Sequence, residues 1–92
     1  MRPELAALRK AGITRARFSA RYSGRSRRGH IRLSDVQTPI GGCMDHAWIR
    51  PRQWHGPLPA PGARVEFRAQ IECYWRDDGS QDLGLIRLEV LV

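Results

Sequence analysis

Long apolar runs, paired cysteines and lysine are all scarce in this sequence. No apolar run approaches the roughly 20 residues that a membrane-spanning helix requires, and the first five residues carry no apolar segment of signal-peptide length. We therefore expect a cytoplasmic protein that has no membrane partner. In that reducing compartment, the two cysteines, Cys43 and Cys73, have no reason to form a disulfide.

The length of 92 residues allows a single domain, 1–92, with one small core. This excludes an enzyme that encloses its substrate between two domains, and also a fold built from repeated βαβ units. A hydrophobic content of 41% is too high for a wholly disordered basic tail. We expect one small folded domain.

Acidic residues are few in the first half of the chain. The formal net charge is +7, and fifteen of the sixteen basic residues are arginine. Residues 1–46 contain ten basic and three acidic groups, whereas residues 47–92 contain six of each. Between Arg9 and Arg32 there are nine basic residues and no acidic one. A solvated face usually carries compensating acids, so this segment favours a polyanionic partner, with nucleic acid as the leading candidate.

Periodicity divides the chain into a short helix and a series of strands. Pro3, Glu4 and Gly12 suit the start and the end of a helix over residues 3–11. Alternating apolar residues then predict strands over 15–23, 30–36, 43–49, 64–75 and 84–92. Four prolines argue against a regular element between residues 50 and 62, and residues 77–80 have the composition of a hairpin loop.

A short helix over 1–12 followed by five strands over 15–92 predicts a small, mainly β domain. A five-stranded OB-like barrel fits the strand count and the long connection between the third and fourth strands. An SH3-like barrel is the alternative, because strand count does not determine topology.

Six of the fifteen arginines fall on the predicted open face of the first strand and in the loop that follows it. Arginine binds phosphate through two parallel hydrogen bonds and stacks on bases, and a loop rich in glycine and serine lets backbone amides approach phosphate. The alternative is a disordered, solubilising loop. The predicted phosphate-binding residues are Arg15, Arg17, Arg21, Arg25, Arg27, Arg28 and Arg32, together with Arg50 and Arg52 farther along the chain.

A groove for single-stranded nucleic acid also needs aromatic side chains on which bases can stack. Strand phase assigns Phe18, Tyr22, Phe67 and Trp75 to the core. The same phase turns Tyr74 outward but does not decide which face of its strand Trp48 occupies. Trp54 falls in the proline-rich connection. The candidate stacking residues are Trp54, Tyr74 and Trp48.

Asp45 and His46, together with Asp35, His30 and His55, raise the possibility of nuclease or metal chemistry. Adjacent residues of a strand point to opposite faces, so Asp45 and His46 converge on one site only if the strand is bulged. Cys43 and His46 have the spacing of half a zinc site, but the sequence has no second pair. We predict no cofactor and no metal site, and interpret the chain as non-enzymatic.

Four segments share the layout of a known group of proteins: residues 33–36, residues 45–49 with the motif Asp-His-x-Trp, residues 62–74 with alternating apolar positions, and residues 82–85. On these segments the sequence resembles small uncharacterised OB-like proteins of phages, plasmids and integrated elements, and the resemblance as a whole covers about two-thirds of the chain. The resemblance implies a binding module of a mobile element. Two departures, the acidic Asp77 and Asp78 and the non-aromatic Leu83, argue against nucleic-acid contact by the last hairpin.

The leading prediction is a non-catalytic module that binds single-stranded nucleic acid, either DNA or RNA. One alternative is a protein-interaction or inhibitor module that acts on a host nucleoprotein complex. Another is a small metal-dependent nuclease built around Asp35, Asp45, His46 or His30. The oligomeric state stays open.

Overall fold

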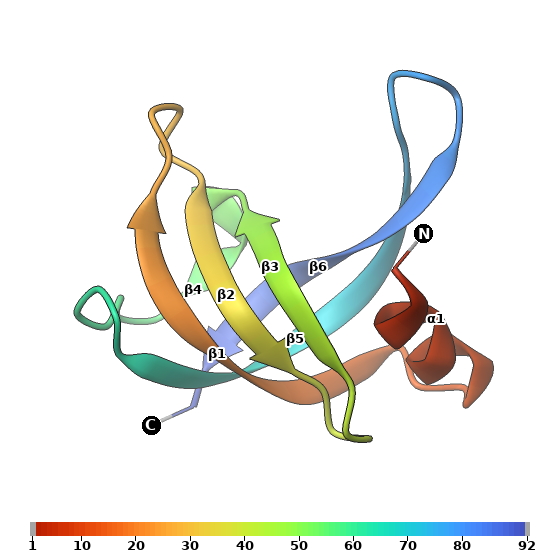
Figure 1. Ribbon diagram of the computed structural model, residues 1–92, viewed down its shortest axis with the longest axis horizontal. Helices are drawn as coiled ribbons and strands as arrows, with labels where there is room; N and C mark the ends of the chain where they lie inside the picture. The colour runs from red at the N-terminus through yellow and green to blue at the C-terminus, as the bar shows by residue number, and fades with distance from the viewer. Residues whose placement is uncertain (1, 92) are drawn as a thin grey trace.

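The computed structural model describes residues 2–91 and has a mainly β fold (Figure 1). One α-helix begins the chain, a short 3-10 helix interrupts it, and six strands make up most of the rest. In chain order these are α1 (Pro3–Lys10), β1 (Arg15–Arg25), β2 (Ile31–Gln37), β3 (Cys43–Ile49), η1 (Pro51–Gln53), β4 (Trp54–His55), β5 (Arg64–Trp75) and β6 (Gln81–Val90). The prediction of a mainly β domain with a short N-terminal helix is confirmed.

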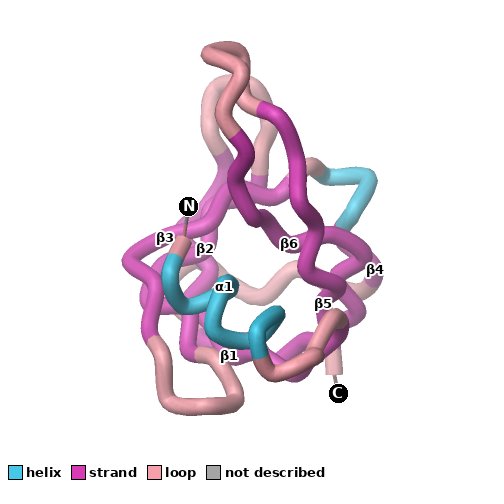
Figure 2. The backbone as a smooth tube through the Cα atoms, turned by 90° about the vertical axis from the view of Figure 1, so that its right-hand side faces the viewer, coloured by secondary structure: helices cyan, strands magenta, loops and turns pink. Residues whose placement is uncertain are grey.

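The strands form one open sheet in the order β3-β2-β1-β5-β6-β4. Every pairing is antiparallel except that of β4 with β6, which is parallel. The sheet curls so that β3 comes near β6, but no ladder joins these two strands within the described part of the chain (Figure 2). The sixth strand, absent from the prediction, is the two-residue β4 inside the proline-rich connection.

The core lies on the inner side of the curled sheet. Phe18 of β1 stacks on Phe67 of β5, with the ring centroids 5.7 Å apart, and both side chains are buried. Leu5 and Leu8, one turn apart in α1, are fully buried against the same core. An isolated helix of this length is unstable in water, so burial of these two leucines is what stabilises α1.

Two irregularities in the ladders bend the sheet. Asp35 in β2 and Arg87 in β6 have positive φ angles, 49° and 52°, and the strand register shifts beside each of them. Strict alternation is broken there: the buried residues are Leu33 and Val36 around Asp35, and Leu85 and Leu88 around Arg87. Such bulges increase the local twist, which lets a short sheet curl around a core.

Beyond Ile71 the β5–β6 hairpin projects from the rest of the sheet, and we call residues 72–84 the arm (Figure 1). Within the arm, Asp82 and Leu83 of β6 are still buried. The turn is closed by a hydrogen bond of 2.8 Å from Arg76 N to Ser80 O, which confirms the predicted hairpin loop. The assignment of Trp75 to the core was wrong, since its side chain is 70% exposed. The alternation of β5 continues along the arm, but no second layer of structure covers that face.

Candidate nucleic-acid interface

An exposed tryptophan lies near the end of β3, on the outer face of β2 and β3. In β3, Ala47 and Ile49 are buried, so Trp48 between them points outward and is 47% exposed. Arg32 of β2 is its ladder partner, and the guanidinium carbon lies 5.5 Å from the centroid of the Trp48 ring. This is a cation–π contact, which holds the indole beside a positive charge.

The loop between β1 and β2 is a hydrogen-bonded turn at one end of this face. Ser26 N donates to His30 O at 2.9 Å, Gly29 N donates to Ser26 O at 2.9 Å, and His30 N donates to Ser26 Oγ at 3.1 Å. Gly29 has a φ of 83°, which favours glycine. The turn leaves Arg27 and Arg28 exposed at its tip.

Two hollows adjoin at Trp48. The first, which we call the cationic hollow, has a volume of about 500 Å³ and is lined by Ser26, Arg27, Arg28, His30 and Trp48. The second, the arm hollow, measures about 410 Å³ and lies between β3 and the β5–β6 hairpin. Trp48 and His30 line both, and the other residues of the arm hollow include Arg2, Arg50, Gln53, Glu72, Tyr74, Trp75 and Gly84.

Three of the predicted arginines of β1 do not belong to this surface. Arg15 pairs with Glu89 at 2.9 Å, Arg17 pairs with Glu66, and Arg21 donates to Gly62 O at 3.0 Å. Their charges are partly neutralised over β1, β5 and β6.

The remaining predicted arginines keep their charge available. Among residues 2–91, none of them forms an ion pair or a hydrogen bond through its side chain. The hollows are lined by three of them, Arg27, Arg28 and Arg50. Arg32 contacts Trp48. The last two, Arg25 and Arg52, are exposed but line neither hollow.

Of the other two candidate stacking residues, one lies on this surface and one does not. Tyr74 is 38% exposed and lines the arm hollow. Trp54 is only 9% exposed, with its ring tilted against Phe67 at 6.2 Å, so its assignment as an exposed platform was wrong. The parallel pairing of β4 with β6 places Trp54 opposite Leu88 and turns the indole into the core.

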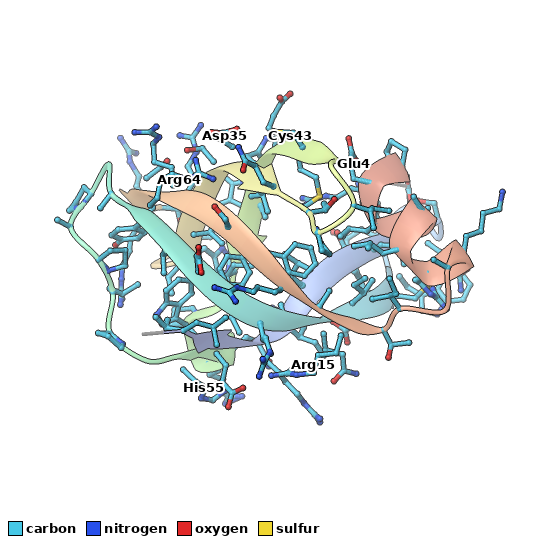
Figure 3. The ribbon with its side chains drawn as sticks, turned by 90° about the horizontal axis from the view of Figure 1, so that it is seen from below. Glu4, Arg15, Asp35, Cys43, His55 and Arg64 are labelled. Atoms are coloured by element: carbon cyan, nitrogen blue, oxygen red, sulfur yellow. The ribbon has the colours of Figure 1, made fainter. Side chains whose placement is uncertain are left out.

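Asp35 is bound by neighbouring side chains (Figure 3). The Cys43 thiol donates to its Oδ1 at 3.1 Å, and Arg64 Nη1 donates to its Oδ2 at 2.8 Å. The Cys43 hydrogen bond and the Arg64 guanidinium hold the pKa of Asp35 below its ordinary value, and the same carboxylate raises the pKa of the Cys43 thiol. Arg64 also donates to Ser19 Oγ, so this cluster links β1, β2 and β5.

Asp45 and His46 are both exposed, beside the bulge at Asp35. His46 contacts the edge of the Trp48 ring, with centroids 6.4 Å apart. Within residues 2–91, His, Cys, Asp and Glu form no group of three or more that could hold a metal ion.

Sequence reasoning missed several residues of the two hollows: Arg2, His30 as a lining residue, Gln53, Glu72 and Trp75. They come from four separate segments of the chain, which the curled sheet brings together. The one signal for the arm in the sequence was the length of the predicted strand over residues 64–75, whose alternation continues through residues 72–75.

No helix in the described part of the chain is long and apolar enough to span a membrane. No family model, curated protein or solved structure matches this chain. The resemblance to mobile-element proteins stays a prediction.

Proposed function

We propose that this chain is a non-catalytic module that binds single-stranded nucleic acid, DNA or RNA, across Trp48. The observation that carries the proposal is an exposed indole surrounded by arginines without carboxylate partners among residues 2–91. Stacking of a base on an exposed aromatic ring contributes about 1–3 kcal/mol and accepts any base. The arginines supply the sequence-independent attraction for phosphate.

The arrangement of the strands supports an OB-like interpretation of this surface. OB-folds bind oligonucleotides across their second and third strands, between the loop joining strands 1 and 2 and the loop joining strands 4 and 5. Here β1, β2, β3, β5 and β6 correspond to the five strands, with the seam between β3 and β6 left open. The turn at residues 26–30 and the arm then flank Trp48 on its two sides. A mobile-element origin, which the resemblance implies, is part of this proposal.

A single strand fits this surface better than a duplex does. In a duplex the bases are stacked on each other, so Trp48 could not reach a base face and only the phosphate contacts would remain. Unpaired bases can be splayed onto aromatic rings, which is how single-stranded ligands are bound.

Replacement of Trp48 tests the proposal. Trp48 is exposed, so we expect Trp48→Ala to fold normally and to weaken binding of a labelled single-stranded oligonucleotide by about tenfold at low salt, measured by fluorescence anisotropy. Trp48→Phe retains a stacking surface and should bind almost as well as the wild type.

Ile40→Ala is the matched control, since Ile40 is 55% exposed but lies in the turn between β2 and β3, away from both hollows. It should bind as the wild type does. Absence of single-strand binding by the wild type at low salt would overturn the proposal, and so would equal binding by Trp48→Ala.

A further inference from the structure

The two hollows beside Trp48 differ in charge. The charged side chains lining the cationic hollow are Arg27 and Arg28, with His30 beside them. The arm hollow has Arg2 and Arg50, but it also contains Glu72, which is the one acidic residue lining either hollow within residues 2–91. A carboxylate repels phosphate, so the nucleic-acid backbone and the bases should be placed differently in the two hollows.

The Glu72 carboxylate is free to accept a hydrogen bond. It forms no hydrogen bond and no ion pair with any other described residue. Its ladder partner in β6 is Gly84, which has no side chain to cover it. Tyr74 lies two positions along β5, on the same face of the strand, and its ring passes over Gly84: a Cβ there would lie 3.1 Å from the ring.

Gln53 contributes a complementary group from η1. Its Oε1 accepts a hydrogen bond of 2.9 Å from Arg87 N, and its amide NH₂ group has no hydrogen-bond partner among residues 2–91, so it remains available as a donor. The arm hollow therefore combines an acceptor from Glu72, a donor from Gln53 and the aromatic surfaces of Tyr74, Trp75 and Trp48. Such a set suits the edge and the face of a nucleobase.

We propose that the arm hollow is a base-recognition site in which Glu72 accepts a hydrogen bond from the exocyclic amino group of an unpaired base. The proposal rests on the single-strand binding proposed above. Cytosine and adenine carry this amino group, whereas thymine and uracil carry a carbonyl oxygen in the place of the cytosine amino group. The phosphates then lie over the cationic hollow, the bases turn toward the arm, and cytosine or adenine is preferred to thymine or uracil.

The test compares oligomers of cytosine and of thymine, whose rings have the same size. Full-length protein is titrated into labelled strands of about 10 nucleotides, a length within the usual site sizes of OB-folds, at about pH 8 to keep cytosine neutral. We expect the wild type to bind the cytosine strand about fivefold more tightly, the lower end of what a hydrogen-bonded base contact provides. In Glu72→Gln the amide both donates and accepts, so the preference should fall to less than about twofold while thymine binding is retained.

Glu66→Gln is the matched control. It removes the same charge from the same strand, but Glu66 binds Arg17 and lines neither hollow, so the cytosine preference should persist. Glu72→Ala is a second variant and should lose the preference as Glu72→Gln does.

The outcomes separate this inference from the proposed function. Equal binding of both strands by the wild type, or an unchanged preference in both Glu72 variants, overturns base recognition but leaves single-strand binding standing. No binding of either strand at low salt overturns both.

Discussion

Trp48 and Trp54 are the same residue type a few positions apart, yet they have different roles. Trp48 belongs to β3, where pairing with β2 keeps it on the outer face. Trp54 belongs to β4 and pairs with Leu88 of β6, which lies 34 residues later in the chain. The side that a tryptophan faces depends on such long-range pairing, so neither burial nor stacking could be assigned to them from local pattern alone.

Replacement of Trp54 should affect stability and not binding. Trp54→Ala should lower the free energy of unfolding by about 3–5 kcal/mol, as for other large aromatic residues of a core. Trp54→Phe should cost much less, because the buried indole N–H of Trp54 has no hydrogen-bond partner among residues 2–91 and its removal offsets part of the lost contact. Urea unfolding measures both variants. Equal losses in the two would contradict the account.

At the scale of elements, the arm contains a buried carboxylate. Asp82 lies opposite Tyr74 in the arm, where it pairs with Arg76 and accepts a hydrogen bond of 2.8 Å from Leu83 N. Burial alone would raise the pKa of Asp82, but the hydrogen bonds from Arg76 and Leu83 and the charge of Arg76 outweigh it, so that pKa lies below the ordinary value of 3.8.

This lowered pKa predicts an acid-dependent loss of stability. A carboxyl whose pKa is depressed by folding contributes stability above its ordinary pKa, and loses it as the pH falls through the folded value. Near neutral pH, Asp82→Asn should therefore be less stable than the wild type by about 1–3 kcal/mol. As the pH falls below 3.8 and through the lowered folded pKa of Asp82, the difference should shrink in urea unfolding, because the protonated carboxyl is as neutral as the amide that replaces it.

Asp77→Asn provides the control for this titration. Asp77 lies at the tip of the same arm and is exposed, without a hydrogen bond or an ion pair to another residue of 2–91. Its replacement should leave stability unchanged at both pH values. A constant deficit of Asp82→Asn from neutral to acid would show that packing, not charge, is what Asp82 contributes.

Most elements could be predicted because their periodicity is regular. The bounds of α1, β3 and β5 follow from Leu5 and Leu8 one turn apart and from apolar alternation. The bulges at Asp35 and Arg87 could not, since both require a positive φ at residues other than glycine, which ladder geometry imposes. Without these bulges the curl of the sheet and the approach of β3 to the arm are lost, and so the hollows were not foreseen.

For the molecule as a whole, the net charge of +7 is less informative than its distribution. Over β1, β5 and β6, Arg15 and Arg17 are paired with Glu89 and Glu66. Around Trp48, Arg27 and Arg28 have no such partners within the described part of the chain. The sequence predicted an excess of arginine in the first half, but not which guanidiniums are already neutralised, because the paired acids come from β5 and β6.

Two double variants with the same net charge can separate local from global electrostatics. Each phosphate of a single strand that the protein binds steepens the dependence of log K on log salt concentration by about 0.7, because counterions are released from the strand. Arg27→Gln with Arg28→Gln should therefore reduce that slope by about 1.4 and weaken binding most at low salt. Arg15→Gln with Arg17→Gln removes the same charge but only groups that are already paired, so the slope should stay within about 0.3 of the wild type. If the two double variants lose the same slope, the protein attracts nucleic acid through its total charge, and the surface around Trp48 has no special part in holding phosphate.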